Sequence, residues 1–324
     1  MHLTILGNSS GGPFHGRHYT AQLLQSENHA FLIDCGEGTQ MQLFEYKIRH
    51  DHIQQIFISH LHGDHAFGLI GLLTNWGLKK RTEKLQLFSP PGLKEWIETT
   101  IRLFGVRLSY ELEFVEVDAT VSAKIFENNQ VEVWTIPLLH RTACSGWLFR
   151  EKEKPRNIKK EKITEYNIHF SLIPGIKAGA DLLLSPDGLH QLATGESHAV
   201  ELARISNQEL TIPPSPARSY AFCSDTAPSE VVADVVKGVD LLYHEATFTR
   251  EHEAEALISF HSTAAQAASI ALRAGAKRLL LGHFSGRYAD EKMHLKEAAA
   301  IFEETYIAME GLRWEIGSEQ LGNK

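Results

Sequence analysis

Four metal-ligand side chains follow one apolar segment within six residues, and this cluster constrains the fold more than any other feature of the chain. The segment Ile56–Ser59 has the pattern of a short strand, and the sequence continues directly as His60-Leu-His-Gly-Asp-His65. A loop at the end of a strand can fold around an ion, and Gly63 supplies the permissive backbone that close ligand packing needs. We therefore expect a strand that ends in a metal site.

The ligand types in this cluster indicate a catalytic site. Imidazole and carboxylate groups suit zinc, manganese and iron alike, and the cluster lacks the cysteines of many closed structural sites. A single histidine in such a place is more often structural than a ligand, but four groups in this spacing favour metal binding. One ion cannot easily accept all four from so tight a loop. We expect His60 and His62 to bind one metal and Asp64 and His65 to bind a second.

Two metals need further ligands, which must come from elsewhere in the chain. The candidates share one position, directly after an apolar run, and they are His140, Asp225 and His283. They are far apart in sequence. The metal hypothesis therefore requires the fold to bring them to the loop that holds His60.

Other motifs resemble known binding or catalytic sites, but each lacks a residue that the site requires. Gly36-Glu-Gly-Thr-Gln-Met41 follows a strand-like run, yet Met41 replaces the third glycine of the dinucleotide-binding fingerprint, so we interpret it as a tight turn. The His-Glu pairs at His244 and His252 lack the second histidine of a zincin helix. The sequence also contains no P-loop.

The rhythm of apolar runs predicts a mixed α/β protein. Strand-like runs occur at residues 3–6, 30–33, 55–59, 85–88, 131–136, 221–223, 240–243 and 278–281. Helix-like stretches occur at residues 67–76, 93–104, 263–274 and 290–305. The third of these begins with Ser262 or Thr263 as its expected N-cap.

One stretch, about 151–218, is polar and irregular and separates two halves that share the strand, loop and helix rhythm. We interpret it as an inserted arm in one domain. Residues 150–162 contain seven basic and three acidic side chains, although the whole chain has 32 basic and 40 acidic residues and a net charge of −8. A charge run alone is more often a solvated surface than a binding site.

Bulk properties narrow the class of protein. At 43 % hydrophobic and 22 % charged residues the chain can bury a substantial core, and its negative charge does not attract polyanions through the average field. The three cysteines, Cys35, Cys144 and Cys223, are expected to be free buried thiols. No basic leader begins the sequence and no run approaches ~18 apolar residues, so we expect a cytoplasmic protein without a membrane span.

Several segments together resemble the ribonuclease Z family of the metallo-β-lactamase superfamily. They are Leu6-Gly-Asn-Ser-Ser-Gly, Phe31-Leu-Ile-Asp-Cys-Gly-Glu-Gly-Thr-Gln40, Ser59–His65, Ser224-Asp-Thr226, His244-Glu-Ala-Thr247, His261-Ser-Thr263 and His283-Phe-Ser-Gly-Arg-Tyr288. The run around His60 is specific for the fold of the superfamily but not for a substrate. The segments that begin at His244, His261 and His283 narrow the choice of substrate. The resemblance implies an α/β (α+β) four-layer αββα sandwich over residues 1–318, with the arm inserted at about 151–218.

The resemblance also implies a set of site residues. One metal would be bound by His60, His62 and His140, the other by Asp64, His65 and His283, and Asp225 would bridge them. The ions would be divalent, with zinc favoured and manganese or iron possible. In catalysis, Asp64 would orient the attacking water, His261 would act as general acid and Glu245 would hold the imidazole of His261.

The implied activity is that of an endoribonuclease, a hydrolase that removes the 3′ trailer of precursor tRNA. The arm would bind tRNA, Lys79-Lys80-Arg81 would form a weaker basic patch, and the protein would form a homodimer. The alternatives are an enzyme of the same fold that hydrolyses a small phosphodiester or sulfate ester, and a non-catalytic RNA-binding protein. Two segments depart from the usual sequence of the family, Ala227-Pro228 and the loop Pro13–His18. They concern the assignment of the substrate and do not change the expected metal ligands.

Overall fold

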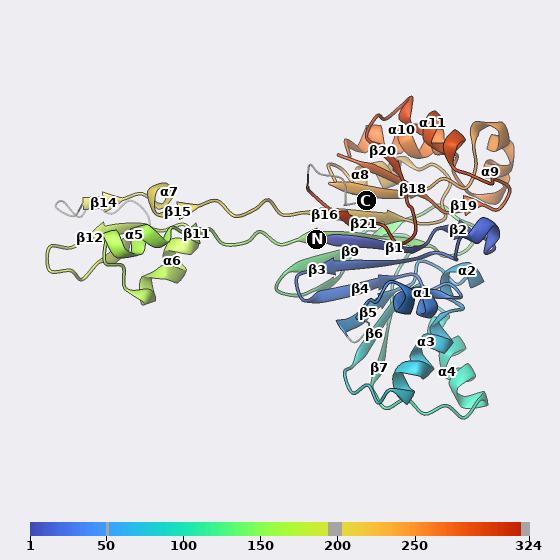
Figure 1. Cartoon of the computed structure of the whole chain (residues 1–324), viewed down its shortest axis with the longest axis horizontal. Coiled ribbons are helices and arrows are strands. Elements are labelled where there is room, and N and C mark those ends of the chain that lie inside the picture. Colours follow the sequence, from blue (N-terminus) through green and yellow to red (C-terminus); the bar gives the residue numbers. More distant parts are fainter. Residues whose placement is uncertain (50–51, 194–202, 319–324) are drawn as a thin grey trace. The chain divides into compact units, whose positions relative to one another are not determined.

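The computed structural model describes residues 1–49, 52–193 and 203–318 and divides into two compact units, residues 1–151 with 218–324 and residues 152–217 (Figure 1). Within the first unit, one seven-stranded sheet has the spatial order β21 (Arg313–Glu315), β1 (His2–Gly7), β3 (Ala21–Ser26), β4 (His29–Ile33), β5 (Ile53–Phe57), β6 (Leu85–Ser89) and β7 (Leu112–Glu116). The other has the order β20 (Thr305–Ile307), β18 (Leu279–Gly282), β17 (Leu241–Glu245), β16 (Ser219–Cys223), β10 (Ser145–Glu151), β9 (Val131–Pro137) and β8 (Lys124–Glu127).

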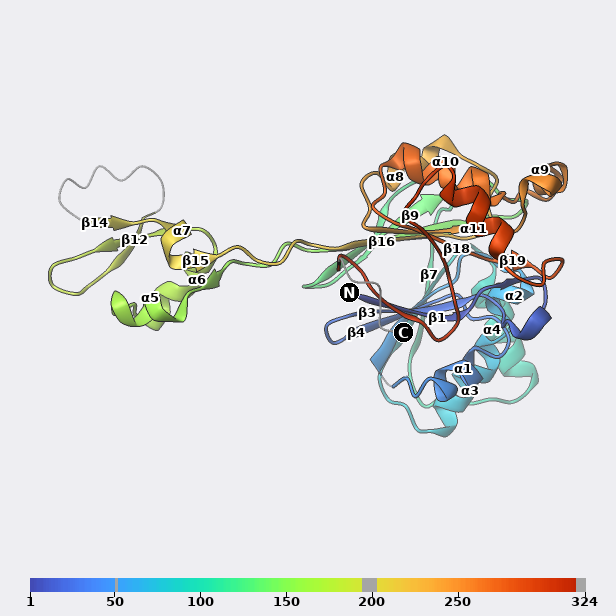
Figure 2. The same ribbon diagram turned by 45° about the horizontal axis from the view of Figure 1, so that its top comes forward.

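The two sheets stack through one shared apolar core, because alternating strand residues place apolar side chains on their inner faces. Phe31 and Phe57 of the first sheet form this core with Trp147, Phe149 and Phe222 of the second. Helices cover the outer faces, as Figure 2 shows. They are α1 (Thr39–Glu45), α3 (Leu69–Leu78) and α4 (Leu93–Leu103) on the first sheet, and α8 (Glu230–Val235), α10 (Ala264–Ala274) and α11 (Lys292–Ala299) on the second. The predicted αββα sandwich is confirmed.

Most predicted elements are present with shifted ends. Thr263 is the N-cap of α10 and forms a capping box with Gln266, as one of the two expected caps. The helix predicted over residues 290–305 is wrong at its end, because α11 stops at Ala299 and Thr305 begins strand β20. The β-branched and aromatic residues of β20 pair in parallel with β18, so residues 305–307 are extended and not helical.

Short helices and strands lie in the loops that connect the strands and helices of the first unit. They are β2 (Ser9–Ser10), η1 (Phe14–Gly16), α2 (Gly63–Ala66), η4 (Arg250–His252), α9 (Glu253–Ser259) and β19 (Phe284–Ser285). Strand β2 pairs with β19, so the N-terminal loop lies beside the residues that follow His283. The expected tight turn after Gly36 leads into α1, which has Gly38 as its left-handed N-cap.

The second unit has a small core of its own, formed by Ile168, Ile176, Leu182 and Leu210. Its elements are β11 (Asn157–Ile158), α5 (Lys160–Glu165), η3 (Phe170–Leu172), α6 (Ile173–Lys177), β12 (Asp181–Leu184), β13 (Gln191–Ala193), β14 (Ala203–Ile205), α7 (Asn207–Leu210) and β15 (Thr211–Ile212). Part of the expected arm, residues 194–202, lies outside the described residues.

Candidate active site

Several predicted site residues lie where parallel strands of the two sheets end. His60 follows β5, Glu245 ends β17 and His283 follows β18. The carboxyl ends of neighbouring parallel strands meet at one edge of a sheet, and ligand sites in α/β proteins form there. The two stacked sheets present these edges to the same space, so residues far apart in sequence come together.

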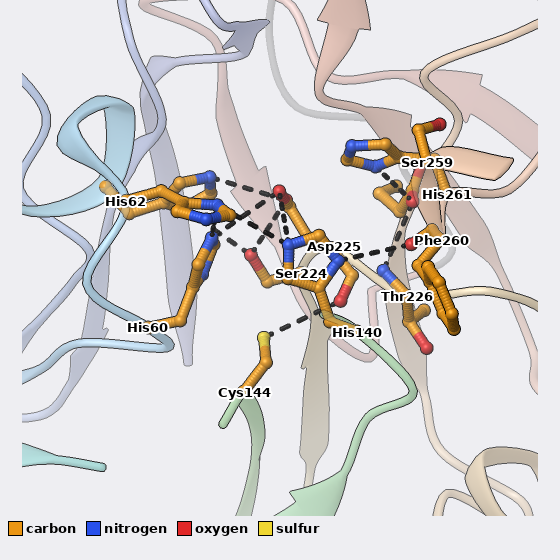
Figure 3. Close-up of polar contacts among 12 residues, drawn as sticks. His60, His62, His140, Cys144, Ser224, Asp225, Thr226, Ser259, Phe260 and His261 are labelled. Carbon is orange, nitrogen blue, oxygen red and sulfur yellow. Dashed lines mark hydrogen bonds and ion pairs between the residues drawn. The ribbon is translucent and has the colours of Figure 1, made fainter. Parts of the chain in front are cut away.

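The first group of ligand atoms contains His60, His62, His140 and Asp225, all within 4.8 Å of one another (Figure 3). His60 Nε2 lies 2.9 Å from His62 Nδ1, and His140 Nε2 lies 3.4 Å from the same atom. Burial lowers the pKa of His60 well below its ordinary value, so its imidazole is neutral and can share an electron pair with a cation.

The second group contains Asp64, His65 and His283. The Nε2 atoms of His65 and His283 lie 3.2 Å apart, and Asp64 Oδ2 lies 3.7 and 3.6 Å from them. Burial opposes ionisation of Asp64, but the two imidazoles outweigh it and lower its pKa. A Cβ at Gly63 would lie 2.5 Å from the ring of Phe67, so a larger residue there requires this exposed ring to move.

Asp225 lies between the two groups and presents one oxygen to each. Its Oδ1 lies 3.3 Å from His65 Nε2 and 3.1 Å from His283 Nε2. Its Oδ2 lies 3.5 Å from His60 Nε2 and 3.9 Å from His140 Nε2. Burial favours the neutral acid, yet the surrounding imidazoles lower the pKa of Asp225 well below its ordinary value. The carboxylate is therefore ionised and can serve both groups.

Asp34 orients the second group, although the sequence analysis gave it no role. Its Oδ2 lies 2.7 Å from His65 Nδ1, and the backbone N–H of Ser59 donates to Oδ1 at 2.7 Å. A carboxylate on Nδ1 fixes the tautomer and turns Nε2 towards the group. Asp34 directly follows β4, the same signal that identified His283. It adopts a left-handed φ of 55°, which marks a constrained position.

Two further contacts align the ligands. The backbone N–H of Gly11 donates to Asp64 Oδ2 at 2.9 Å, which connects the N-terminal loop to the second group. Thr247 Oγ1 donates to Glu245 Oε2 at 2.8 Å and lies 3.0 Å from His283 Nδ1. Because that hydroxyl gives its proton to Glu245, it accepts from His283 Nδ1 and leaves Nε2 free for a cation.

Glu245 and His261 form a buried acid and imidazole pair beside the ligand groups. His261 Nδ1 lies 2.9 Å from Glu245 Oε1, and the backbone N–H of Ser262 also donates to this oxygen at 2.9 Å. The rings of His261 and His283 stack at 5.5 Å. Burial opposes the charged form of His261, but the carboxylate of Glu245 raises its pKa to about 9. The ring is protonated at neutral pH and can donate a proton.

This pairing predicts a pH effect for the variant Glu245→Gln. The sequence analysis expects His261 to act as a general acid, and such a group works only while it is protonated, so we expect the rate to fall as the pH rises through the pKa of His261. The substitution removes the charge that raises this pKa, so the alkaline limb of the kcat/KM profile should move to lower pH. An unchanged alkaline limb would show that Glu245 does not control the proton of His261.

All of the predicted metal and catalytic residues lie at this one site. They are His60, His62, Asp64, His65, His140, Asp225, Glu245, His261 and His283. The three cysteines are free and buried, as expected. The predicted basic patch at 79–81 is wrong for Arg81, which is buried and donates to the backbone oxygens of Ile53 and Glu83. Within the described ranges, no helix has the length and apolar character needed to cross a membrane.

Solved structures share this fold at low sequence identity. The short form of human tRNase Z is 24 % identical, with 98 % of this chain and 100 % of that chain covered and a TM-score of 0.66. A metallo-β-lactamase fold protein from Bacillus subtilis is 18 % identical, with 97 % and 98 % covered and a TM-score of 0.64. These likenesses establish the metallo-β-lactamase fold.

Sequence relatives identify the family. A family model described as anti-Pycsar protein Apyc1 matches residues 1–151. Ribonuclease Z of Bacteroides thetaiotaomicron is 42 % identical over 96 % of this chain and 93 % of its own length. Ribonuclease Z of Porphyromonas gingivalis is 41 % identical over 96 % of this chain and 98 % of its own length. With this identity over nearly the whole length, the chain belongs to the ribonuclease Z family.

Proposed function

We propose that this protein is a metal-dependent endoribonuclease that cleaves precursor tRNA and releases its 3′ trailer. The observation that carries the proposal is the position of Asp225, whose two oxygens face two separate groups of imidazole and carboxylate atoms. Membership of the ribonuclease Z family supports the substrate and disfavours a small phosphodiester or sulfate ester.

The ligand atoms fit two divalent cations, and zinc is our choice for both. Within each group, two imidazole nitrogens face each other at 2.9 to 3.2 Å beside a carboxylate. Such an arrangement of electron-pair donors suits a cation, and imidazole with carboxylate is a typical zinc set. The carboxylates of Asp225, Asp64 and Asp34 also raise the pKa of His65 well above its ordinary value, against the effect of burial. A site this negative favours bound cations.

The chain's own side chains then have separate roles in hydrolysis. Two such cations, when bound, lower the pKa of a shared water and neutralise charge on the phosphodiester. Asp64 orients the attacking water and accepts its proton. His261 protonates the leaving 3′ oxygen, and Glu245 holds the imidazole in the required orientation. The hydrogen bond from Gly11 keeps the carboxylate of Asp64 aligned for this task.

Incubation with a precursor tRNA that carries a 3′ trailer tests the proposed function. We expect a mature 3′ end directly after the discriminator base, and no product after a chelator has removed the metals. Re-addition of Zn²⁺ should restore cleavage. Rapid hydrolysis of bis(p-nitrophenyl) phosphate without any cleavage of precursor tRNA would instead support the small-substrate alternative.

The arm, residues 152–217, is proposed to bind the tRNA. Seven basic residues lie between 150 and 162, and a cationic segment binds phosphates with an affinity that falls as salt is added. Some of these charges already have partners within the arm, since Lys162 contacts Glu165 and Glu209. We assign phosphate binding to the segment as a whole, in which seven basic side chains outnumber three acidic ones.

Deletion of residues 152–217 provides a direct test of the arm. The flanking residues are adjacent, because the backbone N–H of Glu151 donates to the carbonyl of Arg218 at 2.8 Å, so a short glycine linker can join them. Precursor tRNA cleavage should fall by about 10²-fold, since a second contact to the same substrate is lost. Hydrolysis of bis(p-nitrophenyl) phosphate should persist, and equal loss of both activities would refute the separate role of the arm.

We also propose that the protein is cytoplasmic and that it forms a homodimer, the second of which the family resemblance implies. Apolar side chains are exposed on α1 and on the adjacent α3, where Met41, Phe44 and Leu78 are 74 %, 50 % and 83 % exposed. Exposed apolar groups on neighbouring helices support a protein contact there. Light scattering of the purified protein should give the mass of two chains, and a monomer at micromolar concentration would contradict the proposal.

A further inference from the structure

Helix α9 leads directly to His261, and few packing contacts hold this helix. Among its seven residues, all of which the structure describes, Ala256 alone is buried, whereas Leu257 and Ile258 are each 71 % exposed. A segment that buries so little apolar surface is held weakly by packing. The position of His261 therefore depends on the polar contacts at the end of α9.

The residue between α9 and His261 has a strained backbone. Phe260 ends the helix with φ 59° and ψ 45°, the left-handed region that suits glycine, and its Cβ makes this conformation costly. The backbone N–H of His261 then donates to the carbonyl of Ala256 at 2.9 Å, so His261 continues directly from the helix end. A strained conformation persists only where surrounding contacts hold it. The contacts around Phe260 therefore also set the direction of His261.

Two neighbouring residues of another loop hold the end of α9. Arg141 Nη2 donates to the carbonyl of Ile258 at 2.8 Å. The adjacent His140 Nδ1 donates to the carbonyl of Phe260 at 3.2 Å (Figure 3). The last carbonyls of a helix lack partners within it, and basic side chains can supply them. Because the guanidinium of Arg141 is charged, its hydrogen bond is stronger than one between neutral groups.

The loop that carries Arg141 has anchors of its own. The backbone N–H of Leu139 donates to Thr226 Oγ1 at 3.0 Å, and the N–H of Ala227 donates to the carbonyl of Leu139 at 2.8 Å. These bonds hold the loop against the segment that follows β16. Loss of the Arg141 side chain should therefore free the end of α9 and leave the first ligand group in place.

We propose that Arg141 is a positioning residue, which holds the end of α9 so that His261 stays aligned with the leaving group. This inference rests on the proposed endoribonuclease function, in which His261 protonates the leaving oxygen. Arg141 acts through His261 and does not itself bind the substrate. A displacement of about 1 Å can lower a rate by about 10²-fold, so an exposed side chain outside the reaction centre can have a measurable effect.

The test compares the metal-loaded wild type with Arg141→Ala and with the control Arg107→Ala, which removes another exposed arginine. Arg107 precedes β7, whereas His140 and Arg141 line a cavity with residues that follow β7. Hydrogen exchange of the amides of residues 257–262, followed by mass spectrometry, reports on the end of α9 without any substrate. Steady-state rates on precursor tRNA and on bis(p-nitrophenyl) phosphate report on the chemistry.

In Arg141→Ala we expect exchange at the end of α9 to be about tenfold faster, because a hydrogen bond from a charged group is lost. On precursor tRNA, kcat should fall by about tenfold at unchanged KM. The rate on bis(p-nitrophenyl) phosphate and the metal content should stay at their wild-type values, since p-nitrophenolate leaves without a proton. Arg107→Ala should match the wild type in every measurement.

Wild-type exchange at the end of α9 in Arg141→Ala would overturn the inference. An equal loss of rate on both substrates would also overturn it, because the effect would then not pass through His261. A raised KM on precursor tRNA at unchanged kcat would instead show that Arg141 binds the RNA. Failure of the proposed function is observed separately, as a wild type that does not cleave precursor tRNA, and the exchange measurement does not depend on cleavage.

Discussion

Asp225→Ala should lose both metals and lower hydrolysis of any phosphodiester by about 10³-fold or more. The substitution removes one oxygen from each ligand group, and it leaves the imidazoles of His60, His65 and His283 around an empty space. Stabilisation of transition-state charge by bound metals is worth several kcal/mol, and each ~1.4 kcal/mol is a factor of ten in rate. Elemental analysis and the rate on bis(p-nitrophenyl) phosphate measure the two effects.

A surface carboxylate provides the matched control for this experiment. Asp234 is exposed on α8, so Asp234→Ala makes the same chemical change away from the site. It should keep two metals per chain and the wild-type rate. Full metal occupancy in Asp225→Ala would contradict the role of Asp225 as the shared ligand, whatever happens to the rate.

His261→Ala should lower kcat on precursor tRNA by between about 10² and 10⁴-fold while both metals stay bound. A positioned general acid contributes this much when the leaving group is strongly basic, as a ribose 3′ oxygen is. The loss on bis(p-nitrophenyl) phosphate should be much smaller, because p-nitrophenolate leaves without needing a proton. The pairing of His261 with the buried Glu245 supports this role.

The comparison of leaving groups separates a proton donor from a structural residue. A histidine that only supported the loop would reduce both reactions by the same factor. His52, exposed just before β5 and at the other end of that strand from His60, provides the control variant His52→Ala. Unchanged turnover of precursor tRNA in His261→Ala would remove this residue from the mechanism.

The sequence predicted the ligand positions because one physical rule places them. Residues that directly follow buried parallel strands reach the same edge of a sheet, so His60 and His283 could be identified from the apolar runs before them. Asp34 follows β4 in the same way and was missed, because its role depends on a contact with His65 that the local pattern does not encode. The ends of strands identify candidate site residues. Only the fold shows which of these residues orients a ligand, as Asp34 orients His65.

The sequence analysis missed other features because they depend on contacts between segments that are distant in the sequence. The N–H of Gly11 donates to Asp64 from a loop that follows β2, the strand paired with β19, and no motif marks that pairing. The wrong end of the helix predicted over 290–305 has a similar cause, since the pairing of β20 with β18 outweighs local helical periodicity. Arg81 belongs to a basic run in the sequence, yet it is buried and donates to the backbone oxygens of Ile53 and Lys84.

Anomalous diffraction from crystals of the metal-loaded protein tests the central claim most directly. Two peaks should appear, one bounded by His60, His62 and His140 and the other by Asp64, His65 and His283. Each should lie about 2.0–2.2 Å from its ligand atoms, with one oxygen of Asp225 near each peak. A single peak, or peaks away from these side chains, would contradict the account of a shared carboxylate between two cations.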